Sequence, residues 1–576
     1  MNSFKFLQPA IENYLELVAN VSTFGPHPID DLIADAQRAH DALLLQRSTN
    51  LNAASRRYRE RRHRHPPPGF DKWVEYALKH DAVIVEQFFD RIEHDIRPFW
   101  AQDPKLTATW AAAWHHVVRV RNGNVSSVGD VQNLVPWLKH WKELVAEAAK
   151  FMPDVDMPIN YMDESRILVP WEDINLLVQK AEKERKITPI EDTVREYTGL
   201  AEIDMPQLKV YDPNWITTGS YWDLVRLACS PNSPGRNVSA PDDYSNPPNF
   251  PQNWRPSFSE SGYVKNFTAG TDPCIQPHIR TMHGTFVEPV SLSTSQELIP
   301  LFGGSKLPVN NEILIPGAMY LTDDPLYSGG SSHGPPWTRK KGGIIWRGVA
   351  SGGRNKEENW THFQRHRLVE MLNGTTVSSV ERNGIKAKTF EMPPIQMYNF
   401  TRRRKGLIGE WLRNISDAGF MDLVCFPPES NCSYVAPYFR KLNKIPMKKQ
   451  YEQKFMPDVD GNSFSGRFRG LLLSTSLPIK STIYIEWHND RLIPWVHFAP
   501  MDNTFQDLYA ILDYFTRDKR GDAAARVIAE TGKNWAEKVL RRDDMLLYVW
   551  RLLLEFARVC DKNRDKLGFI DDLVPG

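Results

Sequence analysis

The second half of the chain alternates short apolar segments with segments of helical spacing, and this alternation restricts the fold more than any other feature of the sequence. A helix between two strands returns the chain to the same edge of a sheet, so such alternation is typical of a parallel α/β sheet. We expect the elements in this order: a strand at 343–346, a helix at 359–372, strands at 421–426 and 451–456, a helix at 466–474 and a strand at 481–487.

The rest of the chain mostly shows apolar residues at helical spacing. We expect residues 1–150 and 505–567 to be largely helical, with a short strand at 157–162. Pro, Ser and Asn are frequent in residues 230–280, which predicts a long ordered loop, and the glycine-rich segment 322–343 suits a domain boundary. With 576 residues, the chain is long enough for two or more domains.

A polar loop follows the strand that ends near residue 460, and it carries Gly461, Ser463, Ser465, Gly466 and Arg467. Glycines let the backbone approach a ligand closely, and free N–H groups at a helix N-terminus favour an anion. An arginine adds a two-pronged donor that is suited to phosphate. We interpret the loop as the binding site for the diphosphate of a nucleotide. The alternative is an ordinary strand–turn–helix connection with a surface arginine.

Two more charged residues follow predicted strands, namely Asp163 in the first half and Arg347 in the second. In open α/β sheets, ligands bind beyond the carboxyl ends of the strands. There a carboxylate can take a proton from an attacking hydroxyl, while Arg347 and Arg467 stabilise a departing diphosphate. Alternatives stay open, because Asp163 can cap a turn and Arg347 can pair with an acid. Trp171, one short segment after Asp163, is our candidate for an acceptor contact.

The charge balance gives no reason to expect a nucleic-acid partner. Lysine and arginine total 71, aspartate and glutamate total 70, and the net charge is +1, whereas nucleic-acid-binding proteins carry a basic surface. One basic stretch, at 56–65, is short and ends in three prolines, which suits a solvated helix end or a strip against acidic neighbours. No apolar run is long enough to cross a membrane.

Nine Asn-X-Ser/Thr sequons are more than chance would place in a chain of this length, which indicates passage through the secretory pathway. Disulfides form in that compartment, where Cys229 can pair with Cys274 and Cys425 with Cys432. The alternative is five reduced, buried cysteines. Their spacing does not match a metal site.

A series of motifs in this order resembles glycosyltransferase family 90, the capsule-associated-protein-like family, and in particular its fungal branch, which includes β-1,2-xylosyltransferases. The family also includes the protein O-glucosyltransferases. The matching segments cover most of the chain from about residue 55 and lie at 58–73, 156–163, 229–231, 283–284, 305–306, 346–348, 460–467, 486–488 and 492–500.

The resemblance implies a GT-B fold, in which two Rossmann-like domains face each other across a cleft. The implied parts are a helical N-terminal extension (1–100), an N-terminal acceptor domain (101–335), a C-terminal UDP-sugar-binding domain (336–535) and C-terminal helices that pack back on the N-terminal domain (536–576). It also implies residue roles: Asp163 as the catalytic base, Arg347, Arg467, Ser463, Ser465 and Gly466 at the diphosphate, and Asp460, Gly461 and Glu486 near the nucleoside.

The implied reaction is an inverting transfer of a sugar, with xylose expected, from a UDP-sugar to a mannose-containing glycan, giving a β-linkage. The alternatives are a UDP-glucose-dependent O-glucosyltransferase and a non-catalytic glycan-binding protein of the secretory pathway. Asp-X-Asp tripeptides at 154–156 and 458–460 have the form that holds a divalent metal in other glycosyltransferases. Two arginines at the diphosphate would make a metal redundant, so we expect no cofactor besides the donor. We expect a type II membrane protein in the Golgi lumen, anchored by a segment that this chain lacks.

Overall fold

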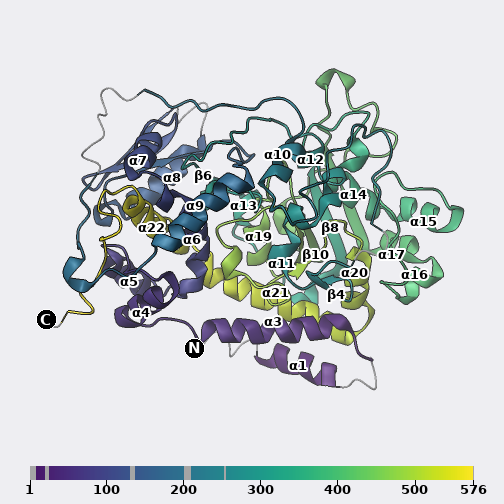
Figure 1. Ribbon diagram of the computed structural model, residues 1–576. Coiled ribbons are helices and arrows are strands. Elements are labelled where there is room, and N and C mark those ends of the chain that lie inside the picture. The colour runs from purple at the N-terminus through teal and green to yellow at the C-terminus, as the bar shows by residue number, and fades with distance from the viewer. Residues whose placement is uncertain (1–7, 20–24, 130–135, 200–208, 252–254, 575–576) are drawn as a thin grey trace.

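A computed structural model describes residues 8–19, 25–129, 136–199, 209–251 and 255–574 (Figure 1). Helices and strands are mixed throughout, as the predicted α/β class requires. The first half of the chain lies mainly at one end of the molecule and the second half at the other.

The second half is built on a five-stranded sheet in the order β12–β11–β10–β8–β9, and every neighbouring pair is parallel. The prediction of a parallel sheet is therefore confirmed. The strands are β8 (Lys341–Val349), β9 (Ser416–Asp422), β10 (Gln453–Val459), β11 (Leu477–Ser481) and β12 (Ala499–Pro500). Helices α14 (Gln364–Met371) and α19 (Phe468–Leu473) lie between strands in the chain, and α20 (Leu508–Arg517) and α21 (Lys519–Val539) follow the last one.

Three predicted strands were wrong in position, and Arg347 was wrongly placed after its strand. The strand expected at 157–162 lies at Val155–Pro158. The strand expected at 481–487 ends where it was expected to begin, because β11 lies at 477–481. Ile485 is buried but bonds to Lys306 outside the sheet, with 2.8 Å from its N–H to the Lys306 carbonyl. The strand expected at 421–426 is β9, which ends at Asp422. Arg347 lies inside β8, opposite Gly419.

The first half contains an antiparallel sheet in the order β2–β1–β3, with β1 (Val117–Arg121), β2 (Asn124–Val128) and β3 (Val155–Pro158). The β1–β2 hairpin corrects the expectation of a mostly helical segment there. Next to β3, Ile159 pairs in parallel with Phe302 of β6 (Phe302–Gly303), and β6 pairs in parallel with β7 (Ile313–Leu314). A complete Rossmann-like sheet in this half stays a prediction.

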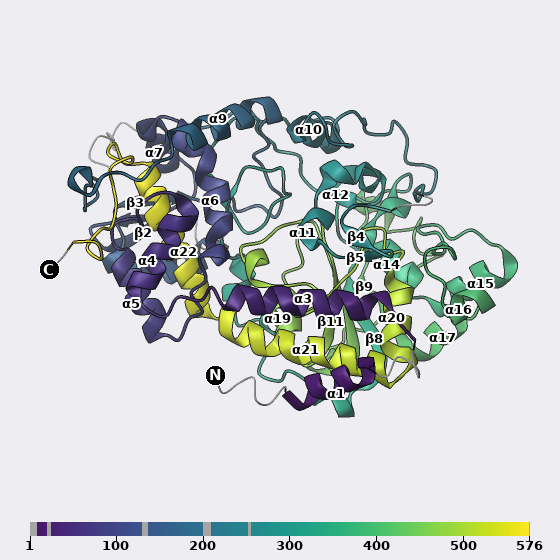
Figure 2. The ribbon, with the colours of Figure 1, turned by 60° about the horizontal axis from the view of Figure 1, so that its bottom comes forward.

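The two ends of the chain cross over. The C-terminal helix α22 (Arg542–Val559) packs among α5 (Phe70–Lys79), α6 (Asp90–Ile96), α8 (Pro136–Ala146) and β3 of the first half. The N-terminal helix α3 (Pro28–Leu44) instead lies alongside α21 (Figure 2), where Ile29 and Leu32 are buried in the core of the second half. Both termini therefore help to hold the two halves together.

The remaining helices connect these layers and are mostly short. They are α1 (Gln8–Ala19), α4 (Leu51–Arg62), α7 (Pro104–Ala112), α9 (Trp171–Glu184), α10 (Tyr221–Ala228), α11 (Phe267–Gly270), α12 (Gly284–Val287), α13 (Pro325–Ser328), α15 (Gly374–Asn383), α16 (Thr401–Lys405), α17 (Ile408–Ile415) and α18 (Met447–Gln450), and a two-stranded hairpin joins β4 (Ser259–Glu260) to β5 (Tyr263–Val264). Residues 230–280 otherwise form the predicted loop, apart from the undescribed residues 252–254. Within the described ranges, no helix is both long and apolar enough to span a membrane.

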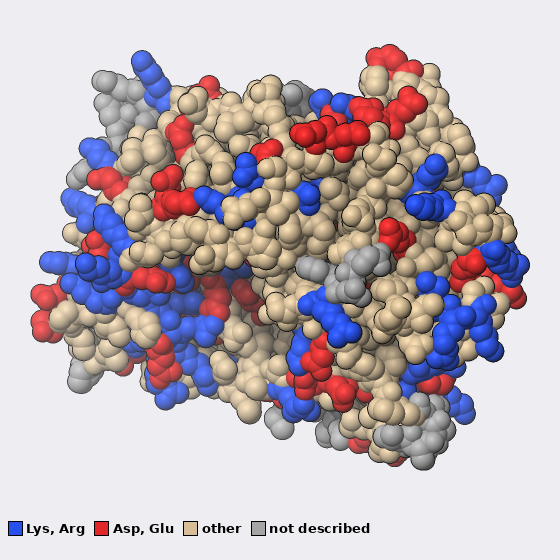
Figure 3. All heavy atoms as spheres, turned by 45° about the vertical axis from the view of Figure 1, so that its right-hand side comes forward, with Lys and Arg blue, Asp and Glu red and all other residues tan. Residues whose placement is uncertain are grey.

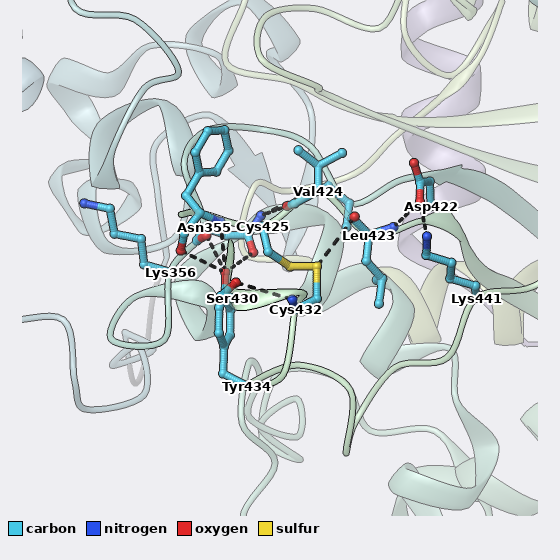
Figure 4. Close-up of a disulfide and its surroundings, with 12 residues drawn as sticks. Asn355, Lys356, Asp422, Leu423, Val424, Cys425, Ser430, Cys432, Tyr434 and Lys441 are labelled. Atoms are coloured by element: carbon cyan, nitrogen blue, oxygen red, sulfur yellow. Dashed lines mark hydrogen bonds and ion pairs between the residues drawn. A yellow bond between two sulfur atoms is a disulfide. The ribbon is translucent and has the colours of Figure 1, made fainter. Parts of the chain in front are cut away.

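Both predicted disulfides are confirmed. Cys229 pairs with Cys274 and Cys425 with Cys432, with Cα–Cα distances of 5.5 and 5.3 Å, and Cys560 is a buried free thiol. Figure 4 shows the second bridge, which closes the loop that follows β9. Beside it, the Tyr434 hydroxyl donates to the main-chain oxygen of Asn355 at 2.6 Å and ties the loop to the segment that follows β8.

The surface distribution of charge agrees with the small net charge. On the face in Figure 3, basic side chains gather at the left of the view, and acidic side chains lie among them. The basic stretch at 56–65 pairs with acidic neighbours, because Arg59 contacts Asp572 and Arg62 contacts Glu86. The second of the two interpretations of that stretch is therefore confirmed.

Candidate active site

The loop of residues 460–467 leaves the central strand β10 and leads into α19, as predicted. Within the described part of the chain, the main-chain N–H groups of residues 463–467 have no hydrogen-bond acceptor. The loop is held from both ends, because the Gly461 N–H donates to the Ser463 carbonyl at 2.8 Å and the Ser465 hydroxyl donates to Asp458. Successive free N–H groups in a fixed loop form an anion-binding concavity. The loop therefore has the features of a phosphate site.

Gly466 is required where the loop passes under a tyrosine. A Cβ atom at this position would lie 2.8 Å from Met319 Cγ and 3.1 Å from Tyr327 Cδ1. Any side chain would push the loop away from both residues. The glycine therefore keeps the loop close to Tyr327.

Arg467 ends the loop with a buried guanidinium that is only partly satisfied. Its Nη1 donates to the Arg347 carbonyl at 2.8 Å, whereas its buried Nη2 has no partner among the described residues. Burial lowers the pKa of this side chain. An unsatisfied buried donor is costly, and a bound anion would remove that cost. Arg467 thus lies where a diphosphate needs a cation.

Arg347 does not join Arg467 through its side chain. Its guanidinium forms an ion pair with Asp417 on the neighbouring strand and also donates to the Asp417 carbonyl at 2.8 Å. The ion pair with a nearby acid, which the sequence left open, is therefore what the structure shows. Arg347 supports the site through its main-chain oxygen, which positions Arg467.

Arg365, at the start of α14, is the second arginine beside the loop, and the sequence analysis missed it. Its Nε donates to the Asp460 carbonyl at 2.8 Å, and its Nη1 donates to Ser351 Oγ at 2.7 Å. Burial and the positive charge of Arg467 lower the pKa of Arg365 to about 9. An anion bound between the two guanidinium groups would offset their repulsion. The sequence did contain one signal for Arg365, because arginines at 365 and 367 lie at the start of the helix after β8.

Asp163 lies on the loop that follows β3, and its carboxylate is free. Asn160 shapes this loop, because its Nδ2 donates to the Glu164 carbonyl at 2.8 Å and its Oδ1 accepts from the Met162 N–H at 3.2 Å. No described group donates a hydrogen bond to the Asp163 side chain, so the capping alternative finds no support. The side chain is exposed, yet the surrounding protein raises the pKa of its carboxyl by desolvation. These properties suit a general base.

Tyr327 on α13 connects the two sides of the site. Burial raises the pKa of its hydroxyl, Asp324 and then Asp163 raise that pKa further, and Arg467 and Arg365 lower it. The Asp163 carboxylate and both guanidinium groups therefore lie close enough to act on one phenol ring. Asp163 and Arg467, which are 304 positions apart in the sequence, thus both lie in the surroundings of Tyr327. No pattern in the sequence pointed to Tyr327.

The residues expected near the nucleoside are buried and partnered. Asp460 accepts from Thr482 Oγ1 at 2.6 Å and from the Ile483 N–H at 2.9 Å, so it fixes the segment after β11. Gly461 lets Arg365 approach, since a Cβ there would be 3.0 Å from Arg365 Nη2. Glu486 accepts from the Tyr320 hydroxyl at 2.6 Å. The carboxylates of Asp460 and Glu486 are thus occupied by protein donors.

The Asp-X-Asp carboxylates also have protein partners. Asp458 pairs with the buried Lys480 at 2.9 Å, and Asp156 pairs with Arg119 and Arg121, each at 2.6 Å. Among the residues that the structure describes, no three His, Cys, Asp or Glu side chains converge as metal ligands would. Trp171 lies elsewhere, in a separate pocket whose lining does not include Asp163.

Comparison with known proteins relates the C-terminal part of this chain to a glycosyltransferase family. Residues 433–566 match the family model described as glycosyl transferase family 90, which confirms the predicted resemblance over a segment containing Arg467 but not Asp163 or Arg365. Protein O-glucosyltransferase 1 of Homo sapiens is 28% identical over 123 residues, 21% of this chain and 31% of that protein. Protein O-glucosyltransferase 2 of Danio rerio is 30% identical over 133 residues, 22% and 26% of the two chains. O-glucosyltransferase rumi of Drosophila pseudoobscura pseudoobscura is 31% identical over 111 residues, 18% and 26%. The chain thus matches a third or less of these relatives' length.

Proposed function

We propose that this chain transfers a sugar from a UDP-sugar to a hydroxyl of a mannose-containing glycan, with inversion at the sugar and with xylose as the sugar. The observation that carries the proposal is the set of free N–H groups of residues 463–467 beside the unpartnered Nη2 of Arg467. This set matches the charge and the hydrogen-bonding capacity of a diphosphate. We also propose that the two halves of the chain correspond to the facing domains of the GT-B arrangement.

In the proposed reaction, Asp163 takes the proton of the acceptor hydroxyl as its oxygen attacks C1 of the donor sugar. The attack comes from the face opposite UDP, so the new bond is β. The bond from C1 to the diphosphate oxygen breaks, and its electron pair leaves with UDP. Arg467, Arg365 and the loop N–H groups stabilise the charge that develops on the diphosphate. The raised pKa of Asp163 makes it a better proton acceptor than an ordinary aspartate.

The reaction is proposed to need no divalent metal. Two guanidinium groups and five N–H groups supply the positive potential that a metal ion supplies in other transferases. The carboxylates of both Asp-X-Asp tripeptides are engaged with protein partners, which supports the same proposal.

The test is a UDP-release assay across a panel of UDP-sugars, with an α-mannoside acceptor and EDTA present throughout. Acceptor-dependent release from UDP-xylose is expected. Release only after excess manganese is added would overturn the metal-independent mechanism. Release from UDP-glucose would favour a second candidate, an O-glucosyltransferase, which the names of the relatives support. Binding of UDP without transfer from any donor would favour a non-catalytic glycan-binding protein.

We further propose that the protein works in the lumen of the Golgi. Seven described sequon asparagines are exposed, at 124, 237, 266, 373, 399, 414 and 431, while Asn359 is buried. Two disulfides suit the same compartment. Protein expressed in a eukaryotic secretory host is expected to lose mass on treatment with an N-glycosidase. An unchanged mass would contradict this part of the proposal.

A further inference from the structure

A pocket of about 440 Å³ lies at the beginning of α9, apart from the loop site. Its walls come from α9, from α6 and from the segments on either side of the Cys229–Cys274 disulfide. Figure 2 shows α9 and α6 next to each other at the end of the molecule that holds the first half of the chain. The residues that matter for its chemistry are Trp171, Ile174, Ser230, Asp272 and Asn311.

Two polar side chains of the pocket are fixed through one atom and leave the other free. Asp272 Oδ1 accepts from the Cys274 N–H at 2.8 Å, and Asn311 Oδ1 accepts from the Val169 N–H at 2.9 Å. Their Oδ2 and Nδ2 atoms have no partner in the described ranges of the chain. The pocket therefore holds one hydrogen-bond acceptor and one donor whose side chains are already fixed. A ligand that bonds to them would cost little side-chain entropy.

Two further polar atoms of the lining are also free. The described residues offer no hydrogen-bond partner to Trp171 Nε1 or to Ser230 Oγ. The disulfide between Cys229 and Cys274 joins the segment of Ser230 to that of Asp272, so these groups keep their relative positions. The lining thus combines the indole ring of α9 with separate donors and acceptors, two of which lie on segments that the disulfide joins.

We propose that this pocket binds sugars of the mannose-containing acceptor that are remote from the reacting hydroxyl. A sugar ring presents a face of C–H groups, which packs on an indole ring, and an edge of hydroxyls, which both donate and accept hydrogen bonds. The pocket offers both kinds of contact, and its volume is within the range of ligand sites. This inference rests on the proposed function, since it assigns the pocket to the acceptor of that reaction.

The spacing along the chain fits a remote sugar and not the reacting one. Eight residues separate Asp163 from Trp171, and a fully extended chain covers at most about 3.6 Å per residue, or about 29 Å in all. The chain therefore keeps Trp171 within about 29 Å of Asp163, an upper limit that an oligosaccharide of several sugars can span. Asp163 itself is not part of the pocket lining, so one sugar ring does not have to fill both places.

The test compares two acceptors, methyl α-mannoside and an α-linked mannotetraose, with three variants. Trp171→Ala removes the indole ring. Asp272→Asn keeps the bond to the Cys274 N–H and removes the charge. Leu176→Ala is the matched control, because Leu176 is on the same helix, is 66% exposed and does not line the pocket. Binding of each glycan is measured by calorimetry without donor, and KM is measured with donor.

We expect Trp171→Ala to weaken mannotetraose binding and raise its KM about tenfold, with a smaller change for Asp272→Asn. Values for methyl α-mannoside, and those of the Leu176→Ala control, should not change. The inference is overturned if mannotetraose binds no more tightly than methyl α-mannoside, or if the two pocket variants bind it as the wild type does. Glycan binding that depends on Trp171, without sugar transfer from any donor, would instead refute the proposed function and leave the pocket assigned.

Discussion

The six residues Phe-Met-Pro-Asp-Val-Asp occur twice in this chain, at 151–156 and at 455–460, and the two copies have different structures. In the first copy, Phe151 ends a 3₁₀ helix and β3 begins only at Val155. In the second copy, all residues up to Val459 belong to β10. Phe151 is 38% exposed, whereas Phe455 is 1% exposed. Tertiary surroundings, and not local preference, decide which structure these six residues adopt.

The copies resemble each other in what they support. Each has carboxylates engaged with protein partners, and each is followed seven residues later by a charged residue of the site, Asp163 after Asp156 and Arg467 after Asp460. The segment after β3 therefore carries the negative charge of the candidate site, and the segment after β10 carries a positive charge. Both charges act on the pKa of Tyr327. The comparison teaches that these aspartates anchor the strands and the segments that follow them.

The comparison predicts the largest loss of activity from the residue after the first copy. Asp163→Asn should lower kcat by about 10²- to 10⁴-fold, because it removes the general base. The affinity for UDP, measured by calorimetry, should stay close to that of the wild type, since the groups proposed to bind UDP lie on the loop after β10 and not beside Asp163. Turnover near the wild-type value would show that the first copy leads to no catalytic group.

The residue after the second copy should act on the nucleotide. Arg467→Ala should weaken UDP binding and lower kcat by about 10²- to 10³-fold, because it removes a donor to the developing negative charge. Arg347→Ala is the control, since that guanidinium pairs with Asp417. It should change UDP affinity much less than Arg467→Ala. Equal losses in the two variants would mean that Arg347 turns toward the diphosphate when UDP binds.

Sequence patterns were sufficient for the parallel sheet, the loop after β10 and the two disulfides, because each rests on local spacing or on a small set of pairings. They failed where long-range packing decides. Lys480 makes the segment of β11 a poor strand candidate by composition. The side chain is nevertheless buried in the sheet, because its charge is paired with Asp458. The β1–β2 hairpin did carry a local signal, the dipeptide at Asn122 and Gly123, and both residues have positive φ.

The same reasoning explains the errors within the site. Strand end and charge were enough to select Arg467 and Asp163. Arg347 was selected in place of Arg365 because the sequence does not show that Arg347 pairs with Asp417. The position of Asp417 opposite β8 becomes known only from the register of β8 with β9. Tyr327 enters through a short helix in a glycine-rich connector, where a single sequence offers no pattern to use.

The two copies should also differ in their effect on stability. Asp458 is buried in its pair with Lys480, so Asp458→Ala should lower the free energy of unfolding by about 3–5 kcal/mol, because it leaves a buried charge without its nearest partner. Asp154 accepts one bond at the surface, from the Asn122 N–H at 2.7 Å, and Asp154→Ala should cost about 1 kcal/mol or less. Urea denaturation of both variants measures the difference. Similar losses of unfolding free energy in the two variants would refute the idea that the second copy stabilises the fold more than the first copy does.

The smallest predicted effect is a dependence on pH at Asp163. Desolvation by the surrounding protein raises the pKa of this carboxyl above its ordinary value of about 3.9, and a general base must be ionised to act. The ratio kcat/KM should therefore fall about tenfold per pH unit below that raised pKa. Stability should change in the opposite direction. Because the folded protein favours the protonated carboxyl, ionisation costs stability as the pH rises from the unfolded pKa through the folded one. Asp163→Asn should thus be more stable than the wild type at neutral pH, and this advantage should vanish in acid. If the difference in unfolding free energy between Asp163→Asn and the wild type is the same at neutral and at acid pH, the loop after the first copy leaves Asp163 fully solvated.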